Sequence, residues 1–404
     1  MNLYELKNSR LVALACILFV LLVLAACGSS EDSAGLAPPR PEYSYSPPVS
    51  KADGWTVASA GSLGLSEEKL EAMMNSMPSD FDIVDSIAIA YEGKLVLDET
   101  LRAAPDTFDG WVDNANPDMH ILFSVSKSIA SIGIGIAIDQ GLIEGVDTPY
   151  LGLFPYAAYD NWDERKNDIV LGDVLTMRLG LEWNEWNPPY TSPDNSVLRF
   201  YESEVDFSKA LLDLPMASDP GTTFAYNTPS TVSLGQAIEN SSSISLLDFG
   251  LANLVAPLDI SEVEVLTTPT GLPDLGRGLY LLTRDLLKFG QLFLDQGQWN
   301  GRQIVSAAWA DESAAPHVAL HWTSPQNYDW KLDGYGYLWW TGYFEHNGQQ
   351  LRSFAARGYG QQLLMVVPEL ELVIAIYSHD WNEDPGKVNQ LYDLIARFVI
   401  PAVT

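Results

Sequence analysis

Four short apolar runs, two near each end of the folded part of the sequence, predict a pair of β-hairpins. The runs are residues 85–91, 94–98, 362–367 and 371–377. Gly93 lies in the turn of the first pair and Pro368 in the turn of the second. Short aliphatic runs around a tight turn are typical of antiparallel strands. Strands at both ends with helices between them predict an α+β fold, in which an antiparallel sheet is flanked by helices.

Capping residues and periodicity predict the main helices. Ser66 is followed by two glutamates, which is typical of an N-capped helix start with carboxylates near the positive end of the dipole. A second helix is predicted over about 387–399. Residues 165–270 alternate helix-like stretches with proline-containing loops, which predicts a mostly helical insert. We expect a cleft where this insert meets the sheet layer, because such junctions are favoured ligand sites.

The first 26 residues have the pattern of a secretory signal. Lys7 and Arg10 precede an apolar run over 11–26, and Cys27 follows Ala26. The run is short for a membrane-spanning helix, which needs ~20 apolar residues. Its ending resembles the bacterial lipoprotein box, in which the cysteine is lipidated. An uncleaved anchor with an incidental cysteine is the alternative.

This pattern predicts a bacterial cell-envelope lipoprotein with three parts. Residues 1–26 are the expected signal peptide. Residues 27–60, rich in serine, proline and glycine, are the expected flexible tether between the lipid on Cys27 and the folded domain. Residues 61–404 are the expected domain, held at the membrane outside the cytoplasm.

Charge and cysteine content exclude several classes of function. The chain carries 22 Lys and Arg against 53 Asp and Glu, a formal net charge of −31. A polyanionic surface repels phosphate backbones, so no nucleic-acid partner is expected. The two cysteines, Cys16 and Cys27, both lie in the N-terminal segment, which leaves no disulfide framework and no thiolate metal site in the domain.

A run of apolar or small residues after Phe123 predicts a buried helix that begins with a candidate nucleophile. Ser124 and Lys127 are three residues apart, so the lysine amine can reach the serine hydroxyl on one helical face. Burial lowers the pKa of a lysine, which lets it accept the serine proton near neutral pH. The helix N-terminus also offers a backbone N–H to an oxyanion. Spacing and burial alone are equally compatible with a capped core helix.

A second Ser-x-x-Lys pair, Ser66 and Lys69, has a simpler explanation. Two glutamates follow Ser66, so its helix start is solvated and capping suffices. Lys127 instead lies in the first turn of a buried helix, where the dipole disfavours a cation and burial is costly. A local rule broken in this way is typical of functional sites.

Several ordered motifs resemble the superfamily of serine β-lactamases, penicillin-binding proteins and their hydrolase relatives. They are residues 123–128, 219–228, 283–292, 297–301 and 356–361. The resemblance covers nearly all of 61–400 and implies a β-lactamase/transpeptidase-like fold. It also implies catalytic roles for Ser124, Lys127 and Tyr226, the last as a phenol that relays protons to the leaving group.

Two motifs depart from the β-lactamase pattern. Where class C β-lactamases have Tyr-x-Asn, this sequence has Thr228 in place of the asparagine. Where the third motif is usually Lys-Thr-Gly, this sequence has Ala356-Arg357-Gly358. Both departures look like the branch that contains 6-aminohexanoate-dimer hydrolases and related esterases, so they argue against β-lactam hydrolysis.

The same resemblance implies an oxyanion hole and a substrate contact. The backbone N–H groups of Ser124 and Tyr359 would bind the oxyanion. Arg357 and Gly358 are candidates for substrate binding, with Arg357 facing an anionic end; a surface arginine is the alternative. No cofactor and no metal ion is expected.

Histidines and tryptophans leave other interpretations open. His317 and His321 have the spacing of zinc ligands on a helix, but no third ligand is apparent. His379 and Asp380 would suit a Ser-His-Asp triad, yet no Gly-x-Ser-x-Gly occurs. Six tryptophans are candidates for cleft walls or core. They are Trp183, Trp186, Trp322, Trp330, Trp339 and Trp340.

Together these features predict a serine hydrolase that acts through an acyl-enzyme on small esters or linear amides. One alternative is β-lactamase or DD-peptidase activity. Another is a non-catalytic protein that binds cell-wall peptides. The presence of Ser124, Lys127 and Tyr226 together argues against the non-catalytic alternative, because a pure binder needs none of them.

Overall fold

The computed structural model describes residues 42–102, 118–202, 206–320, 328–382 and 384–403. The chain divides into two units, Met1–Glu42 and Tyr43–Thr404, and every described helix and strand lies in the second. The predicted signal peptide and Cys27 lie outside the described residues. Within the described ranges, no helix is both long and apolar enough to cross a membrane.

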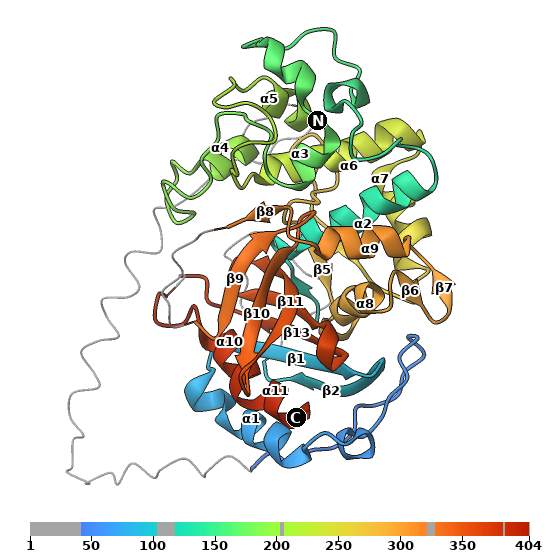
Figure 1. The fold of residues 1–404 in the computed structure, drawn as a ribbon, viewed down its shortest axis with the longest axis vertical. Coiled ribbons are helices and arrows are strands. Elements are labelled where there is room, and N and C mark those ends of the chain that lie inside the picture. Colours follow the sequence, from blue (N-terminus) through green and yellow to red (C-terminus); the bar gives the residue numbers. More distant parts are fainter. Residues whose placement is uncertain (1–41, 103–117, 203–205, 321–327, 383, 404) are drawn as a thin grey trace, which may run out of the picture. The chain divides into compact units, whose positions relative to one another are not determined.

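An eight-stranded antiparallel sheet forms the centre of this second unit (Figure 1). From edge to edge its strands are β2 (Lys94–Thr100), β1 (Val84–Tyr91), β13 (Leu372–Ser378), β12 (Gln362–Val367), β11 (Gln349–Gly358), β10 (Trp340–His346), β9 (Trp330–Tyr335) and β8 (Val318–Ala319). Ile89 of β1 pairs with Ile374 of β13, so the first hairpin joins the last strand of the chain. The prediction that segments from both ends of the sequence share one sheet is therefore confirmed.

Two smaller sheets lie outside this main sheet. β3 (His120–Ile121) and β4 (Glu264–Val265) both pair with β5 (Leu279–Leu281). β6 (Gln298–Trp299) pairs with β7 (Arg302–Gln303). β3 matters for the site, because it leads directly into the turn before Ser124.

Helices flank the main sheet, as the fold class predicts. The α-helices of the described residues are α1 (Glu67–Asp80), α2 (Val125–Asp139), α3 (Leu171–Leu175), α4 (Ser196–Glu202), α5 (Phe207–Leu212), α6 (Thr228–Ser242), α7 (Leu246–Gly250), α8 (Thr283–Leu294), α9 (Ala307–Ala314), α10 (Gln390–Leu394) and α11 (Ile400–Val403). Among them α2 and α8 pack directly on the strands of the main sheet. The segment predicted as a helical insert, 165–270, contains α3 to α7. The predicted C-terminal helix occurs as α10 and α11 with a π-helical turn, Ile395–Val399, between them.

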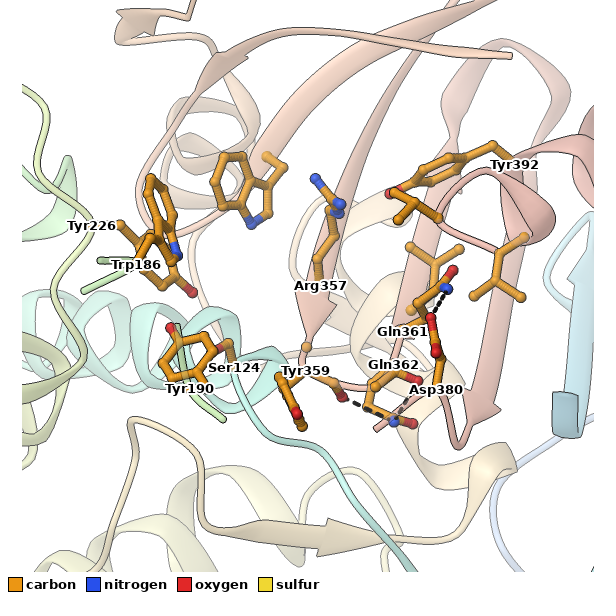
Figure 2. Close-up of a pocket in the computed structure, with 16 residues that line it drawn as sticks. Ser124, Trp186, Tyr190, Tyr226, Arg357, Tyr359, Gln361, Gln362, Asp380 and Tyr392 are labelled. Atoms are coloured by element: carbon orange, nitrogen blue, oxygen red, sulfur yellow. Dashed lines mark hydrogen bonds between the residues drawn. The ribbon is translucent and has the colours of Figure 1, made fainter. Parts of the chain in front are cut away.

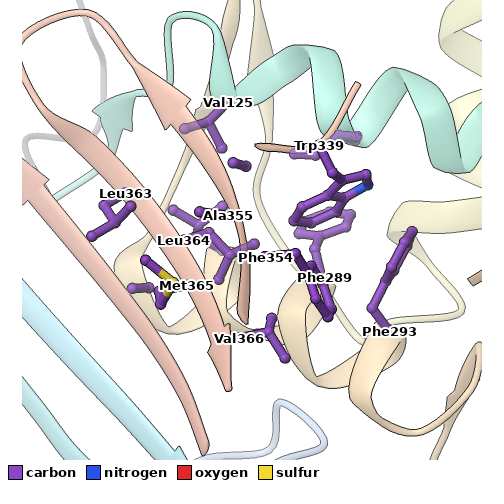
Figure 3. Packing of buried hydrophobic residues seen from close by; sticks show 14 of the residues in the cluster. Val125, Phe289, Phe293, Trp339, Phe354, Ala355, Leu363, Leu364, Met365 and Val366 are labelled. Carbon is purple, nitrogen blue, oxygen red and sulfur yellow. The ribbon is translucent and has the colours of Figure 1, made fainter. Parts of the chain in front are cut away.

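The main core lies between the sheet and the helices α2 and α8. Figure 3 shows Phe289 and Phe293 of α8 beside Phe354 of β11 and Val366 of β12. Phe293 and Phe354 have ring centroids 6.1 Å apart. At Gly290 of α8 a Cβ atom would lie 2.4 Å from a methyl group of Val373, so only glycine lets the helix approach the sheet this closely.

The predicted tether differs from the structure in its second half. Tyr43 donates a hydrogen bond to Glu99, and Tyr45 donates one to the Val96 carbonyl. Trp55 is 5% exposed, and its indole N–H donates to the Arg284 carbonyl. Residues 43–60 therefore pack on the domain, because aromatic side chains in this proline-rich stretch bury enough apolar surface to hold it in place.

Candidate active site

Ser124 lies at the N-terminus of α2, directly after a strained turn. β3 pairs with β5, and the chain then turns at Phe123, which has a φ of 45°. A positive φ in a phenylalanine is costly and persists only where the surroundings enforce it. Ser124 is the N-cap residue of α2, but its side chain makes no capping hydrogen bond. The hydroxyl is therefore directed to other partners.

Lys127 is the nearest of these partners. Its Nζ lies 2.9 Å from Ser124 Oγ and donates to the Gly276 carbonyl at 2.7 Å. The residue is 1% exposed. Burial lowers the pKa of Lys127 to about 8, although the negative charges of Glu185 and Asp274 oppose that shift. Near neutral pH a useful fraction of the amine is therefore uncharged and able to accept the proton of Ser124.

Tyr226 completes the group around the serine. Its phenol is close enough to Ser124 for the serine hydroxyl to lower the pKa of the phenol, and the Nζ of Lys127 lies 5.0 Å from the centre of its ring. Burial raises the pKa of Tyr226 well above its usual value, with the charge of Glu185 adding to the effect. The phenol thus keeps its proton. Its position is fixed by stacking against Trp186 and Trp340, at centroid distances of 5.4 and 5.6 Å.

Glu185 is a site residue that the sequence did not predict. It is 2% exposed, and its carboxylate accepts hydrogen bonds from the Thr228 N–H at 2.6 Å and the Thr228 hydroxyl at 2.5 Å. It also accepts from Tyr190 at 2.6 Å and from Trp183 at 3.2 Å. Thr228, where the related β-lactamases have asparagine, thus anchors a buried carboxylate. The only signal in the sequence is one acid between two tryptophans, which does not predict burial.

Tyr359 and Gly358 approach Ser124 from the main sheet. Gly358 ends β11, and a Cβ at that position would lie 2.4 Å from the Leu122 carbonyl. Only glycine therefore lets the strand end lie against the turn before the nucleophile. Ser124 and Tyr359 line the same cavity (Figure 2). This arrangement brings the two backbones predicted to form the oxyanion hole to one site.

That cavity has a volume of about 370 Å³ and contains Arg357. The guanidinium lies 5.4 Å from the ring centre of Trp340, 5.7 Å from that of Tyr392 and 6.0 Å from that of Trp330. No carboxylate of the described residues forms an ion pair with it. Arg357 therefore lines the cavity as an arginine held by aromatic rings (Figure 2), rather than as the surface arginine that was the alternative.

The two alternative sites, a Ser-His-Asp triad and a zinc site, are not assembled in the described parts of the chain. His379 pairs with Asp85 at 2.8 Å and with Arg102 at 2.9 Å, while Asp380 accepts from Gln361. His321 and Trp322 lie outside the described residues. Within the described ranges, no three His, Cys, Asp or Glu side chains form a group that could hold a metal ion. Of the tryptophans, Trp186 and Trp340 line the cavity, whereas Trp330 and Trp339 are core residues.

Comparison with known proteins identifies a related sequence and solved structures that share the fold described above. The chain is 28% identical over 243 residues to the 6-aminohexanoate-dimer hydrolase of Paenarthrobacter ureafaciens, and the match spans 56% of each protein. It therefore spans about half of that relative. Among solved structures, EstCE1, a hydrolase with promiscuous acyltransferase activity, aligns with a TM-score of 0.62 and 16% identity over 83% of this chain and 99% of its own. An octameric penicillin-binding protein homologue from Pyrococcus abyssi aligns with a TM-score of 0.60 and 16% identity, over 81% of this chain and 76% of its own.

The sequence also matches the profile of the Beta-lactamase family over residues 85–397. This range includes Ser124, Lys127, Tyr226 and Arg357, and it covers most of the described domain. The chain belongs to the Beta-lactamase family.

Proposed function

We propose that this protein is a serine hydrolase that cleaves small esters or linear amides through an acyl-enzyme on Ser124. The observation that carries the proposal is the 2.9 Å contact between Ser124 Oγ and the buried Nζ of Lys127. A lysine with a pKa of about 8 is a competent base at neutral pH, whereas an ordinary lysine is not. A non-catalytic binder has no use for such a costly buried amine.

The proposed reaction has two halves. In the first, Ser124 Oγ attacks the substrate carbonyl and its proton passes to Lys127. Tyr226 donates its proton to the leaving oxygen or nitrogen and is reprotonated from Lys127. In the second, a water molecule attacks the acyl-serine, and the same groups return the proton to Ser124. The backbone N–H groups of Ser124 and Tyr359 would stabilise the oxyanion in both halves.

The substrate class follows from the cavity. Ala356 occupies the place where β-lactamases carry the lysine of their third motif, and Arg357 follows it in the place of the threonine. Thr228 occupies the place of an asparagine. A carboxylate on the substrate would form a charge-assisted hydrogen bond with Arg357. We infer esters or linear amides as substrates, and β-lactamase or DD-peptidase activity as the second candidate. The 6-aminohexanoate-dimer hydrolase and EstCE1, both named as hydrolases and neither as a β-lactamase, support this order.

A screen of three substrate classes tests the proposal. The specificity constant kcat/KM would be compared for p-nitrophenyl butyrate, a linear oligoamide and nitrocefin, with Ser124→Ala as the blank. We expect Ser124-dependent turnover of the ester or the amide, and nitrocefin as the poorest substrate. Nitrocefin turning over faster than both others would replace this function by that of a β-lactamase.

The site of action is a separate proposal. We infer from the segment 11–27 that Cys27 is lipidated and that the domain is held at the bacterial cell envelope outside the cytoplasm. Its substrates would then be small molecules that reach the outer side of that membrane.

A further inference from the structure

Ser124 lies where two cavities of unequal size meet. The larger, about 370 Å³, is the one that contains Arg357. The smaller has a volume of about 50 Å³, and Val197 and Leu198 of α4 form part of its wall. Ser124, Tyr190 and Tyr359 line both cavities. A carbonyl carbon attacked by Ser124 therefore has one substituent on each side.

Tyr226 determines which substituent occupies which cavity. It lines the larger cavity, and it is absent from the described residues that line the smaller one. In the proposed reaction Tyr226 protonates the leaving atom, so the leaving group must lie on its side. The leaving group therefore occupies the larger cavity, beside Arg357, and the acyl chain extends into the smaller cavity.

The volumes limit the two parts of the substrate. One water-sized atom takes about 10–15 Å³ by this measure, so the smaller cavity holds about three to five non-hydrogen atoms. The same conversion gives the larger cavity room for about 25 or more. An acetyl to butyryl chain fits the smaller cavity. An octanoyl chain exceeds this volume, so part of it would have to lie outside the smaller cavity.

The charged residues beside the smaller cavity are already engaged. Glu185 accepts hydrogen bonds from Thr228 and Tyr190. Arg277 pairs with Asp274 at 3.2 Å, and its guanidinium stacks 3.3 Å from the ring centre of Tyr201. Apart from Ser124 and from Thr228, whose hydroxyl donates to Glu185, the remaining wall is aromatic and aliphatic, which favours an apolar acyl chain.

We propose that the substrates are esters or amides of short, apolar carboxylic acids whose leaving group is larger and carries a carboxylate. The inference rests on the proposed function, because it uses Tyr226 as the acid. Ser124 Oγ forms the ester bond to the short acyl group while the C–O or C–N bond breaks. The alcohol or amine takes its proton from Tyr226 and departs toward Arg357. Water then releases the short acid and restores the hydroxyl of Ser124.

A matched ester series tests this orientation. The substrates are 3-carboxyphenyl acetate, butyrate and octanoate, together with the 3-(methoxycarbonyl)phenyl esters of the same acids, each corrected with Ser124→Ala. We expect kcat/KM to fall more than about tenfold from butyrate to octanoate. We expect Arg357→Leu to remove the preference for the free carboxylate over its methyl ester, a change of about ten- to hundredfold.

Enlarging the smaller cavity supplies the second arm. Leu198→Ala, or Val197→Ala if the first variant is unstable by melting temperature, should raise the octanoate-to-acetate ratio of kcat/KM. Leu247→Ala is the matched control, because Leu247 is 47% exposed on α7 and lines neither cavity. Wild-type enzyme that cleaves octanoate as fast as acetate would overturn the orientation, as would an unchanged ratio in both cavity variants. Esters that are cleaved no faster by wild type than by Ser124→Ala would instead refute the proposed function itself.

Discussion

Lys127 is a charged residue type at a position that favours its neutral form. It lies in the first turn of α2, at the positive end of the helix dipole, and its amine is fully buried. No described carboxylate pairs with it directly; its hydrogen-bond acceptors are Ser124 Oγ and the Gly276 carbonyl. Burial is the largest cause of its lowered pKa. This burial costs folding free energy, and in the proposed mechanism the neutral amine accepts the proton of Ser124.

Removing either proton-transfer group should lower turnover severely without unfolding the protein. Lys127→Ala and Tyr226→Phe should each lower kcat by ~10²–10⁴-fold, because both move protons in the transition state. Lys69→Ala is the matched control, since Lys69 belongs to the other Ser-x-x-Lys pair, where Ser66 only caps α1. Steady-state kinetics and a thermal melt check this. Near wild-type activity in Tyr226→Phe would remove that residue from the mechanism.

The pH dependence of the enzyme should report Lys127. Its neutral form is the base, so kcat/KM should rise with pH through a pKa of about 8. The charge of Glu185 raises that pKa and that of Arg277 lowers it. Glu185→Gln should therefore move the rise to lower pH. A pH profile of kcat/KM, recorded for the wild type and for Glu185→Gln, measures the pKa of the rise and its displacement. A rise that stays in place in Glu185→Gln would show that the charge of Glu185 does not act on the base.

The site could be predicted from the sequence only where a motif marked it. Ser124, Lys127 and Tyr226 came from spacing and from the family resemblance, and the structure brings their side chains together. Glu185 had no such mark, because its burial depends on Thr228, Tyr190 and Trp183, which lie up to 43 residues away from it along the chain. The expected cleft between insert and sheet is present, because Tyr226 of the insert and Arg357 of β11 line the larger cavity. The smaller cavity could not be predicted, since it is bounded by several separate segments.

At the scale of elements, β11 and α2 position the proposed catalytic groups relative to each other. The end of β11 touches the turn before Ser124, and Gly358 makes that contact possible. Gly358→Ala would place a methyl group 2.4 Å from the Leu122 carbonyl, so one of the two segments must move.

This contact predicts a loss of activity in Gly358→Ala. A displacement of the order of 1 Å at the site can cost ~10²-fold in rate, so we expect kcat/KM to fall by about that factor. Gly152→Ala is the control, because a Cβ at Gly152 meets nothing within 4 Å. Kinetics and a melting curve for both variants check the expectation. Wild-type kinetics in Gly358→Ala would mean that the close contact between the end of β11 and Leu122 is not needed for activity.

Local patterns predicted some elements better than others. The two hairpins were confirmed because each forms from neighbouring residues around a short turn. The strands β8 to β10 were not predicted, although β10 and β11 form a hairpin around the two-residue turn Asn347-Gly348, which is a typical hairpin signal. β9 then pairs with β10, and the short β8 pairs with β9. Residues 43–60 were assigned to a flexible tether on composition alone. Tyr43, Tyr45 and Trp55 reverse that assignment, because they contact residues 40 or more positions along the chain.

At the scale of the whole molecule, the fold class and the family are confirmed, whereas the attachment to a membrane stays a prediction. A net charge of −31 is repelled by anionic lipid headgroups. An attachment of this chain would therefore depend on covalent lipid rather than on a basic surface.

Cys27→Ser should release the protein from the membrane fraction. The mature wild-type N-terminus should be a diacylglyceryl cysteine by mass spectrometry, and fractionation should place the protein with the membrane. Cys16→Ser is the control, because Cys16 lies inside the apolar run that the signal peptidase would remove. A mature wild-type protein that begins at another residue would contradict the anchor.

The central claim, that Ser124 is a nucleophile activated by Lys127, is tested most directly by covalent labelling. The full chain would be treated with a fluorophosphonate and analysed by intact mass and peptide mapping. The account predicts one adduct per chain, located on Ser124, absent in Ser124→Ala and formed much more slowly in Lys127→Ala. It also predicts a labelling rate that rises through pH 8. An adduct on another serine, or equal labelling of wild type and Lys127→Ala, would contradict it.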